Sequence, residues 1–243
     1  MAVLFASDVH LSAQRPVQVE RFLSFLAGPC RSANAVYLLG DLFDEWLGDD
    51  DDRDPHPRVL AALAQLTRAG VPVSIVHGNH DFLSGEEFVR RSGCRILDQP
   101  TLVHVHGTPV VLLHGDQLCT RDENYQRWRT IFMNPANQRE FLNLDFATRI
   151  ARAAALRHES AQFTRLMPDD IMDVTESAVL EVLRSNNARH MVHGNTHRPH
   201  VHHVDVDGEA GLRVVLGDWY VDDMVVMWDD LGPHLVSAQE LQS

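Results

Sequence analysis

Lysine is absent from this chain of 243 residues, so all 21 basic residues are arginine. Acidic residues number 34, which gives a formal net charge of −13 at pH 7. A protein that binds nucleic acid generally presents a basic face, and this balance argues against such binding. We therefore expect no nucleic-acid partner.

Long apolar runs are also absent, since no run reaches the roughly 18 residues that a membrane-spanning helix needs. The N-terminus, MAVLFASDVH, lacks the charged start and the cleavage site of a signal peptide, and it predicts a first strand. Cys30, Cys94 and Cys119 are odd in number and widely spaced, which is typical of buried thiols in a reducing cytosol. An apolar content of 44% is ample for a core, so we expect a single domain over residues 1–243.

Arginine is concentrated in one part of the chain. Residues 121–165 hold eight arginines and five acidic residues, so the segment carries about +3 and the remainder about −16. A basic, apolar-rich segment on an acidic body suits an anionic ligand or an anionic membrane surface. An ordinary solvated helix pair is the alternative, and charge alone favours it.

The first half of the chain alternates between strand and helix patterns. Short apolar runs predict strands at 2–7, 35–40 and 71–78. Helical spacing predicts helices at 19–27, 56–70 and 85–93. This order predicts a parallel sheet with helices on its faces.

The second half is first helical and then rich in β structure. Residues 101–115 predict a hairpin, and residues 121–165 are mostly helical with a break at Asn134-Pro135. Residues 173–187 predict a helix that Asp173 caps, with a glutamate three positions on. Further strands are expected at 188–194, 201–206, 212–217 and 224–228.

Residue types that bind metals follow five of the predicted strands. They stand at the carboxyl ends of these strands, which is where an open α/β sheet binds its ligands. The endings are Asp8-Val9-His10, Gly40-Asp41 with Asp44, Gly78-Asn79-His80-Asp81, His114-Gly115-Asp116 and His193-Gly194-Asn195-Thr196-His197. One such ending is usually chance or a structural histidine, but five at five strand tips are hard to dismiss. The recurring glycines let the chain turn sharply and approach the site closely.

The mixture of Asp, Asn and His suits ions such as Mn, Fe or Zn, and the lack of Cys ligands disfavours a structural zinc site. There are too many ligands for one ion. The pattern fits two ions that share a carboxylate, roughly 3.5–4 Å apart. Such a pair binds phosphate oxygens and lowers the pKa of a bridging water, so phosphate ester hydrolysis is the reaction that most needs it.

The motifs DxH, GDxxD, GNHD, HGD and the GHxH-type loop resemble those of the calcineurin-like metallophosphoesterases from Asp8 to His197. The resemblance implies an α/β fold, an αββα sandwich. It implies that one divalent ion, expected to be Mn²⁺, is held by Asp8, His10, Asp41 and His197. Asp41 would bridge to a second ion, held also by Asn79, His114 and Asn195.

A closer similarity covers almost the whole chain. LFASDVHL, YLLGDLFDEWLGDDD, VSIVHGNHDFL, LLHGDQLCTRDENYQRWR, IMDVTESAV, HGNTHRPHVH and RVVLGDW resemble segments of the bacterial UDP-2,3-diacylglucosamine diphosphatases. That family hydrolyses the pyrophosphate bond of its lipid-linked UDP-sugar to lipid X and UMP on the way to lipid A. The resemblance implies that a metal-activated hydroxide attacks the α-phosphorus. It also implies a helical cap at about 121–168 and peripheral contact with the cytoplasmic side of the bacterial inner membrane, with no obligate protein partner.

The same resemblance implies head-group contacts from Asn79, His80, Asp122, Tyr125, Arg157, Ser160, Thr164, Met167 and Asn195. Arg157 is the most credible, because a guanidinium binds phosphate bidentately. Apolar side chains of the cap are candidates for an acyl-chain or interface surface, or equally for the core of the cap helices: Trp128, Ile131, Phe132, Phe141, Leu142 and Phe146.

Three positions depart from the family pattern. His80 stands in place of an arginine and, with Asp44, recreates the generic Asp–His pair, in which an imidazole stabilises or protonates the leaving group. The alternative is a histidine without a proton-transfer role. Met167 stands where a basic residue is usual. Asn195 replaces a histidine, and because an amide is a weaker ligand than imidazole we expect a weaker second metal site and slower turnover.

Two other functions stay open at this point. One is a phosphoesterase acting on a soluble nucleotide or phosphodiester, although the long apolar and basic segment is not needed for such a substrate. The other is a binding scaffold that has kept the fold and lost the chemistry.

Overall fold

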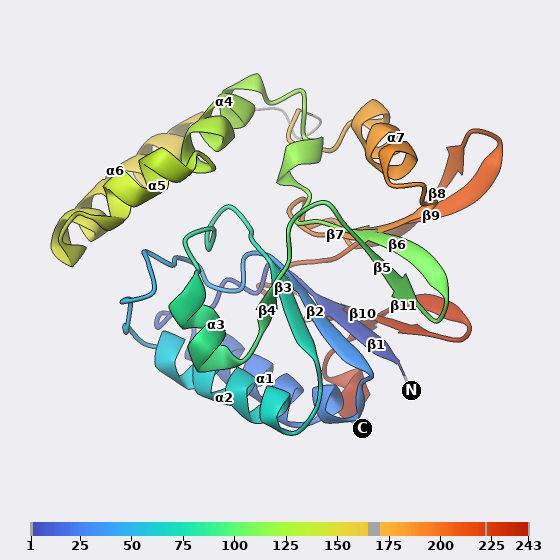
Figure 1. The fold of residues 1–243 in the computed structure, drawn as a ribbon, viewed down its shortest axis with the longest axis horizontal. Coiled ribbons are helices and arrows are strands. Elements are labelled where there is room, and N and C mark those ends of the chain that lie inside the picture. The colour runs from blue at the N-terminus through green and yellow to red at the C-terminus, as the bar shows by residue number, and fades with distance from the viewer. Residues whose placement is uncertain (1, 165–170, 222, 243) are drawn as a thin grey trace.

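The computed structural model describes residues 2–164, 171–221 and 223–242, in which two β-sheets lie face to face (Figure 1). The first sheet has the order β11-β10-β1-β2-β3-β4. Its strands are β1 (Val3–Ala6), β2 (Ala35–Leu39), β3 (Val73–Val76), β4 (Arg95–Ile96), β10 (Met224–Asp229) and β11 (Gly232–Ser237). The strands β1 to β4 are parallel, and β10 runs antiparallel beside β1.

The second sheet has the order β5-β6-β7-β9-β8. Its strands are β5 (Thr101–Val105), β6 (Thr108–Leu112), β7 (His190–His193), β8 (His200–Val206) and β9 (Glu209–Val215). The hairpin predicted at 101–115 is β5 and β6, and β7 is parallel to both of its neighbours.

Helices cover the outer face of each sheet. The first sheet carries α1 (Pro16–Ala27), α2 (His56–Arg68) and α3 (Glu86–Ser92), and the second carries α7 (Glu176–Ser185). Short 3₁₀ turns occupy Pro29–Ser32, Asp116–Leu118 and Glu240–Gln242. This layer order confirms the predicted αββα sandwich.

The side chains of β1 show how the layers arise. Leu4 and Ala6 belong to the apolar cluster beneath α1, α2 and α3, whereas Val3 and Phe5 belong to the cluster between the sheets. Successive side chains of a strand point to opposite faces, so an unbroken apolar run is buried on both sides. The carboxyl ends of the central strands are thereby held in a rigid frame.

A third group of helices lies apart from both sheets: α4 (Glu123–Phe132), α5 (Pro135–Leu142) and α6 (Phe146–Thr164) (Figure 1). We call these three helices the arm. Arg149 of α6 is buried and donates from Nη1 to the carbonyl oxygen of Leu47 at 2.6 Å and to Asp50 at 2.8 Å. The ring of Phe132 stacks on Phe82 with centroids 5.8 Å apart. The arm is therefore anchored to the loops that follow β2 and β3.

Several sequence-based details were wrong. The strands β4 and β11 were not predicted, and the arm has a second break after Leu142. The helix α7 begins at Glu176 with Thr175 as its N-cap, because the Asp173 carboxylate forms an ion pair with Arg198 at 2.9 Å and does not cap the helix. Among the described residues, none of the helices has the length and apolar character needed to cross a membrane.

Candidate metal centre

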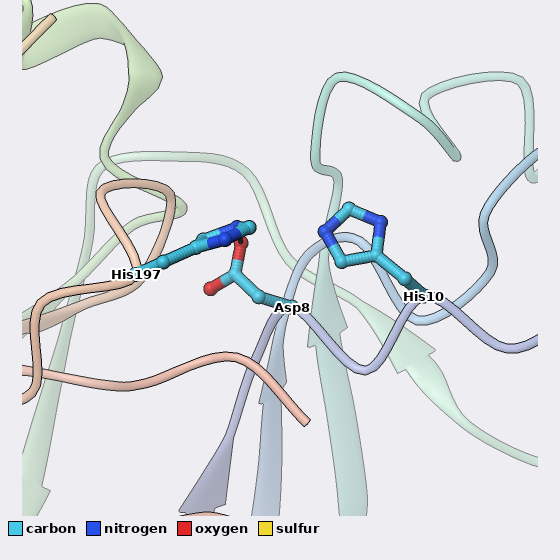
Figure 2. Close-up of side chains that lie close together, drawn as sticks. All are labelled: Asp8, His10 and His197. Carbon is cyan, nitrogen blue, oxygen red and sulfur yellow. Dashed lines mark ion pairs between the residues drawn. The ribbon is translucent and has the colours of Figure 1, made fainter. Parts of the chain in front are cut away.

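The five motif loops converge where the central strands of the two sheets end. Ligand-type atoms lie within 4.8 Å of one another in three overlapping groups: Asp8, His10 and His197; His10, Asp41 and His80; and Asp8, Asp41 and His114. Figure 2 shows the rings of His197 and His10 on opposite sides of the Asp8 carboxylate. The loops after β1, β2, β3, β6 and β7 thus bring distant residues to one place.

Asp8 is fully buried and held from several sides. Its Oδ1 lies 3.2 Å from Nε2 of His197, and its Oδ2 accepts the backbone N–H of Asn195 at 3.0 Å. Burial raises the pKa of Asp8, but the hydrogen bond with His197 and the nearby histidines outweigh it and hold the pKa at about 2. Asp8 is therefore a charged carboxylate.

Asp41 faces three imidazoles. Its Oδ2 lies 3.7 Å from Nε2 of His10, 3.6 Å from Nε2 of His114 and 3.9 Å from Nε2 of His80. Burial raises the pKa of Asp41 to about 6, although His114 and His80 oppose the rise. A central carboxylate among several imidazoles has the placement that a bridging ligand needs.

His114 is oriented by the main chain. Its Nδ1 lies 2.9 Å from the carbonyl oxygen of Leu39 and so donates to it. Nε2 is left facing Asp41 and lies 3.1 Å from the amide oxygen of Asn79. Metal-binding histidines are usually fixed in this way, with one ring nitrogen bonded to a carbonyl and the other free for the ion.

His10 provides the test of whether a metal fits. The side chain is 4% exposed, yet neither ring nitrogen has a hydrogen-bond partner among the described residues. Burial and the neighbouring His80 lower the pKa of His10 to about 2, so the ring is neutral and offers a lone pair. An unsatisfied buried polar group costs about 1–3 kcal/mol. The buried carboxylates of Asp8 and Asp41 beside this imidazole fit divalent cations. Bound cations would balance the charge of both carboxylates and accept the lone pair of His10.

The backbone at the site is strained in a consistent way. Asp8, His10, Asp41, Asn195 and His197 have positive φ angles between 49° and 66°. Such angles are unfavourable for non-glycine residues and cluster at functional sites. Close glycines make room for them: a Cβ on Gly78 would lie 2.0 Å from Oδ1 of Asp41, and one on Gly194 would lie 2.2 Å from Oδ2 of Asp8. This confirms the close approach expected of the motif glycines.

Comparison with known proteins identifies the family. The model of the calcineurin-like phosphoesterase family matches residues 1–199. The chain belongs to this family. Within it, the UDP-2,3-diacylglucosamine hydrolase of Pseudomonas aeruginosa (strain UCBPP-PA14) is 46% identical over 220 residues, which cover 90% of this chain and 91% of that protein.

The UDP-2,3-diacylglucosamine hydrolase of Pectobacterium carotovorum subsp. carotovorum (strain PC1) is 43% identical over 237 residues, covering 98% of this chain and 99% of that protein. The chain therefore also belongs with the UDP-2,3-diacylglucosamine hydrolases. Among solved structures, the phosphoesterase YfcE from E. coli covers 100% of this chain and 96% of its own, with a TM-score of 0.50 and 16% identity, which supports the calcineurin-like fold.

The predicted Asp44–His80 pair is joined through the main chain of Asp44. Nδ1 of His80 lies 2.8 Å from the main-chain oxygen of Asp44 and not beside its carboxylate. The carboxylate instead lies 3.4 Å from Arg15 and accepts from the hydroxyl of Tyr220 at 3.3 Å. His80 is still an oriented imidazole, because a donating Nδ1 leaves Nε2 directed toward Asp41.

The predicted head-group residues have protein partners. Tyr125 donates its hydroxyl to Asp116 at 2.7 Å, and Asp122 caps α4 by accepting the Tyr125 N–H at 2.9 Å. Arg157 pairs through Nη1 with Glu45 at 2.5 Å. The side chains of Ser160 and Thr164, and the whole of Met167, lie outside the described residues.

Apolar side chains on the arm remain partly open. Trp128, Ile131 and Leu142 are 38%, 46% and 38% exposed, and neither α4 nor α5 contains a buried residue. Trp128 stacks on Phe132 with centroids 5.8 Å apart. This surface adjoins the body of the calcineurin-like domain through Phe82.

Sequence reasoning assigned no role to three residues that support the site. Asp218 lies 3.1 Å from Nδ1 of His197, and Asp81 accepts the N–H groups of Leu42 and Gly78 at 2.8 Å. Both stand in motifs, RVVLGDW and VSIVHGNHDFL, that carried the family resemblance. Tyr220 stacks on His10 with centroids 5.1 Å apart, and no local pattern indicated it.

Proposed function

We propose that this protein hydrolyses the pyrophosphate bond of UDP-2,3-diacylglucosamine and releases 2,3-diacylglucosamine 1-phosphate and UMP. The observation that carries the proposal is the buried Asp8–Asp41–His10 cluster with its unpartnered imidazole, in a chain that belongs with the UDP-2,3-diacylglucosamine hydrolases. The protein is a metal-dependent hydrolase of the calcineurin-like phosphoesterase family.

We assign a ligand set for two divalent ions, which the three groups of ligand-type atoms support. Asp8, His10 and His197 would hold one ion, Asn79, His114 and Asn195 would hold the other, and Asp41 would contribute to both. Two bound ions supply charge that offsets the phosphate oxygens and lowers the pKa of water. The nitrogen and oxygen donors fit Mn²⁺, and we propose it as the native ion.

The chain's own groups orient the reaction. Asp218 orients the ring of His197 through Nδ1, which leaves Nε2 facing Asp8, the other assigned ligand. Leu39 fixes His114, and the main chain of Asp44 fixes His80. We assign His80 to the stabilisation or protonation of the leaving phosphate oxygen, because Nε2 of His80 faces the Asp41 carboxylate and the side chain is 31% exposed. Substrate can reach it from solvent.

We propose that the arm caps the substrate and touches the membrane. Its open apolar side chains suit acyl chains, and an interfacial apolar and basic helix binds a bilayer without spanning it. Arg157 has Glu45 as its partner, so contact with a phosphate would require exchange of that ion pair. On this basis the protein lies at the cytoplasmic side of the bacterial inner membrane.

The test is hydrolysis of UDP-2,3-diacylglucosamine in detergent micelles with Mn²⁺, followed by detection of UMP and the acylated sugar phosphate. Asp41→Asn should lose more than about 100-fold in rate, because even partners behind a metal ligand contribute 10–100-fold. An unacylated UDP-sugar serves as the comparison. Equal turnover of both compounds favours a soluble-nucleotide phosphoesterase, and no turnover with no bound metal favours a scaffold.

A further inference from the structure

A pocket of about 300 Å³ adjoins the candidate metal centre on the outer face of the second sheet. Its polar lining comprises Asp173, Thr196, Arg198, His200, His202 and Arg213. Thr196 stands between Asn195 and His197 in the chain, so the loop that carries the candidate ligands also forms one wall of the pocket.

Strand alternation places this lining on one face. His202 pairs in register with Arg213, and His200 pairs with Val215, so all four side chains share a face of β8 and β9. Farther along the same face, Val204 and Val206 pack under α7. Because α7 begins only at Glu176, it does not cover the end of the sheet nearest the candidate metal centre, where the pocket lies.

Among the described residues, the lining of the pocket holds two guanidiniums and one carboxylate. That carboxylate, Asp173, pairs with Arg198 at 2.9 Å. Arg213 Nη1 instead contacts Nε2 of His193 at 3.1 Å, and Nδ1 of that ring lies 2.9 Å from the carbonyl oxygen of Gly194. His193 thus accepts from Arg213 and brings no negative charge to it, so Asp173 is the described carboxylate that acts on both guanidiniums of the lining.

The contact of Arg213 with His193 also joins the pocket to the centre. Gly194 packs against the carboxylate of Asp8, so the chain of contacts runs from Arg213 through His193 and Gly194 to a candidate ligand. On another side, the amide of Asn195 contacts Cys119. An anion held in the pocket would thus lie next to the reacting phosphate.

We propose that this pocket binds the nucleoside monophosphate half of the substrate, a proposal that rests on the proposed function. Guanidiniums match phosphate and carbonyl oxygens, a carboxylate accepts from ribose hydroxyl groups, and the paired rings of His200 and His202, 4.5 Å apart, offer a surface for a planar base. The volume suits a group of this size, since small-molecule pockets begin at about 300 Å³. The acylated half would then extend toward the arm.

The experiment measures binding by calorimetry to the Mn²⁺-loaded protein, with UMP, uridine and inorganic phosphate as separate probes. The variants are Arg198→Gln, His202→Ala and Arg213→Gln. The matched control is Arg184→Gln, because Arg184 forms a similarly exposed ion pair with Asp207 at 2.7 Å but lies outside the pocket. Melting temperature and bound Mn²⁺ report on folding and on the centre.

The wild type should bind UMP more tightly than inorganic phosphate, and uridine should bind detectably. Arg198→Gln and Arg213→Gln should weaken UMP binding by about 10–100-fold, as expected for loss of a charged hydrogen bond. The control should bind as the wild type does. Arg213→Gln also removes the contact with His193 and so could prevent folding. In that case the UMP affinities of Arg198→Gln and His202→Ala test the proposal.

The proposal fails if these variants bind UMP as tightly as the wild type, or if phosphate binds as well as UMP and uridine does not bind. Hydrolysis of UDP-2,3-diacylglucosamine by the same wild-type sample separates this failure from that of the proposed function. A protein that turns over the lipid substrate but shows no pocket-dependent UMP binding keeps its function and loses this subsite.

Discussion

The amide nitrogen of Asn195 lies 3.5 Å from the thiol sulfur of Cys119, and the backbone N–H of the same residue donates to Asp8. The main chain of Asn195 therefore supports one candidate ligand while its side chain contacts a buried thiol. The side chain is available as a ligand only through its amide oxygen, which is a weaker donor than an imidazole nitrogen.

Replacing Asn195 by histidine should tighten the second metal site and raise turnover. A gain of about tenfold or more in Mn²⁺ affinity is expected, since partners of metal sites commonly contribute 10–100-fold. Metal analysis after dialysis and the rate on UDP-2,3-diacylglucosamine provide the measurements. Unchanged stoichiometry together with an unchanged rate contradicts the assignment of residue 195 as a ligand.

Removing metal should destabilise the protein. The buried carboxylates of Asp8 and Asp41 and the unpartnered ring of His10 need compensation, which bound ions provide. Mn²⁺ at 100 times its Kd should add about 2.7 kcal/mol per site to the free energy of unfolding. Thermal melts with Mn²⁺ and with EDTA measure the effect, and Asp41→Asn is the control. A shift of equal size in that variant would mean that Mn²⁺ binds elsewhere.

Polar substitution of the arm should weaken binding to lipid vesicles. Trp128→Ser combined with Ile131→Ser should reduce partitioning onto anionic vesicles by about tenfold or more, because burial of such side chains contributes roughly 1.5–3 kcal/mol each. Sedimentation with vesicles is the measurement. Leu231→Ser is the matched control, since Leu231 is 87% exposed in the β10–β11 turn. Equal losses in both proteins argue against a membrane role for the arm.

Asp51 should make the protein sensitive to acid. Burial raises its pKa, but hydrogen bonds with Arg53 and His56 outweigh this and hold the pKa well below 3.8. A carboxylate with a lowered pKa in the folded state stabilises the fold above the unfolded pKa, and that contribution is lost as pH falls below about 4. Asp51 also accepts the N–H of Leu47, so it supports the loop to which the arm is anchored.

Urea unfolding at several pH values measures this contribution. Asp51→Asn should be less stable than the wild type at pH 7, and the difference should shrink on acidification. Asp52→Asn is the control, because Asp52 is 70% exposed and pairs with Arg91 at the surface. A difference between Asp51→Asn and the wild type that does not vary with pH would show that the charge of Asp51 is not the cause.

The sequence by itself determined the frame and the order of the candidate ligands. Short apolar runs predict β1, β2 and β3, glycines end the second and the third run, and the DxH, GDxxD and GNHD motifs follow at the three tips. These features are local. The alternation of side chains along a strand and the conformational freedom of glycine both depend on residues that are neighbours in the chain. Short elements such as β4, with two residues, have too weak a pattern to predict.

Only the tertiary structure decided which groups share a contact. The pairing of Arg157 with Glu45 joins residues from separate elements, and the bond from His80 goes to the main chain of Asp44. The pocket beside Thr196 likewise depends on where α7 begins over β8 and β9. Such contacts are set by how distant elements pack, and the spacing of residues along the chain carries no record of that packing.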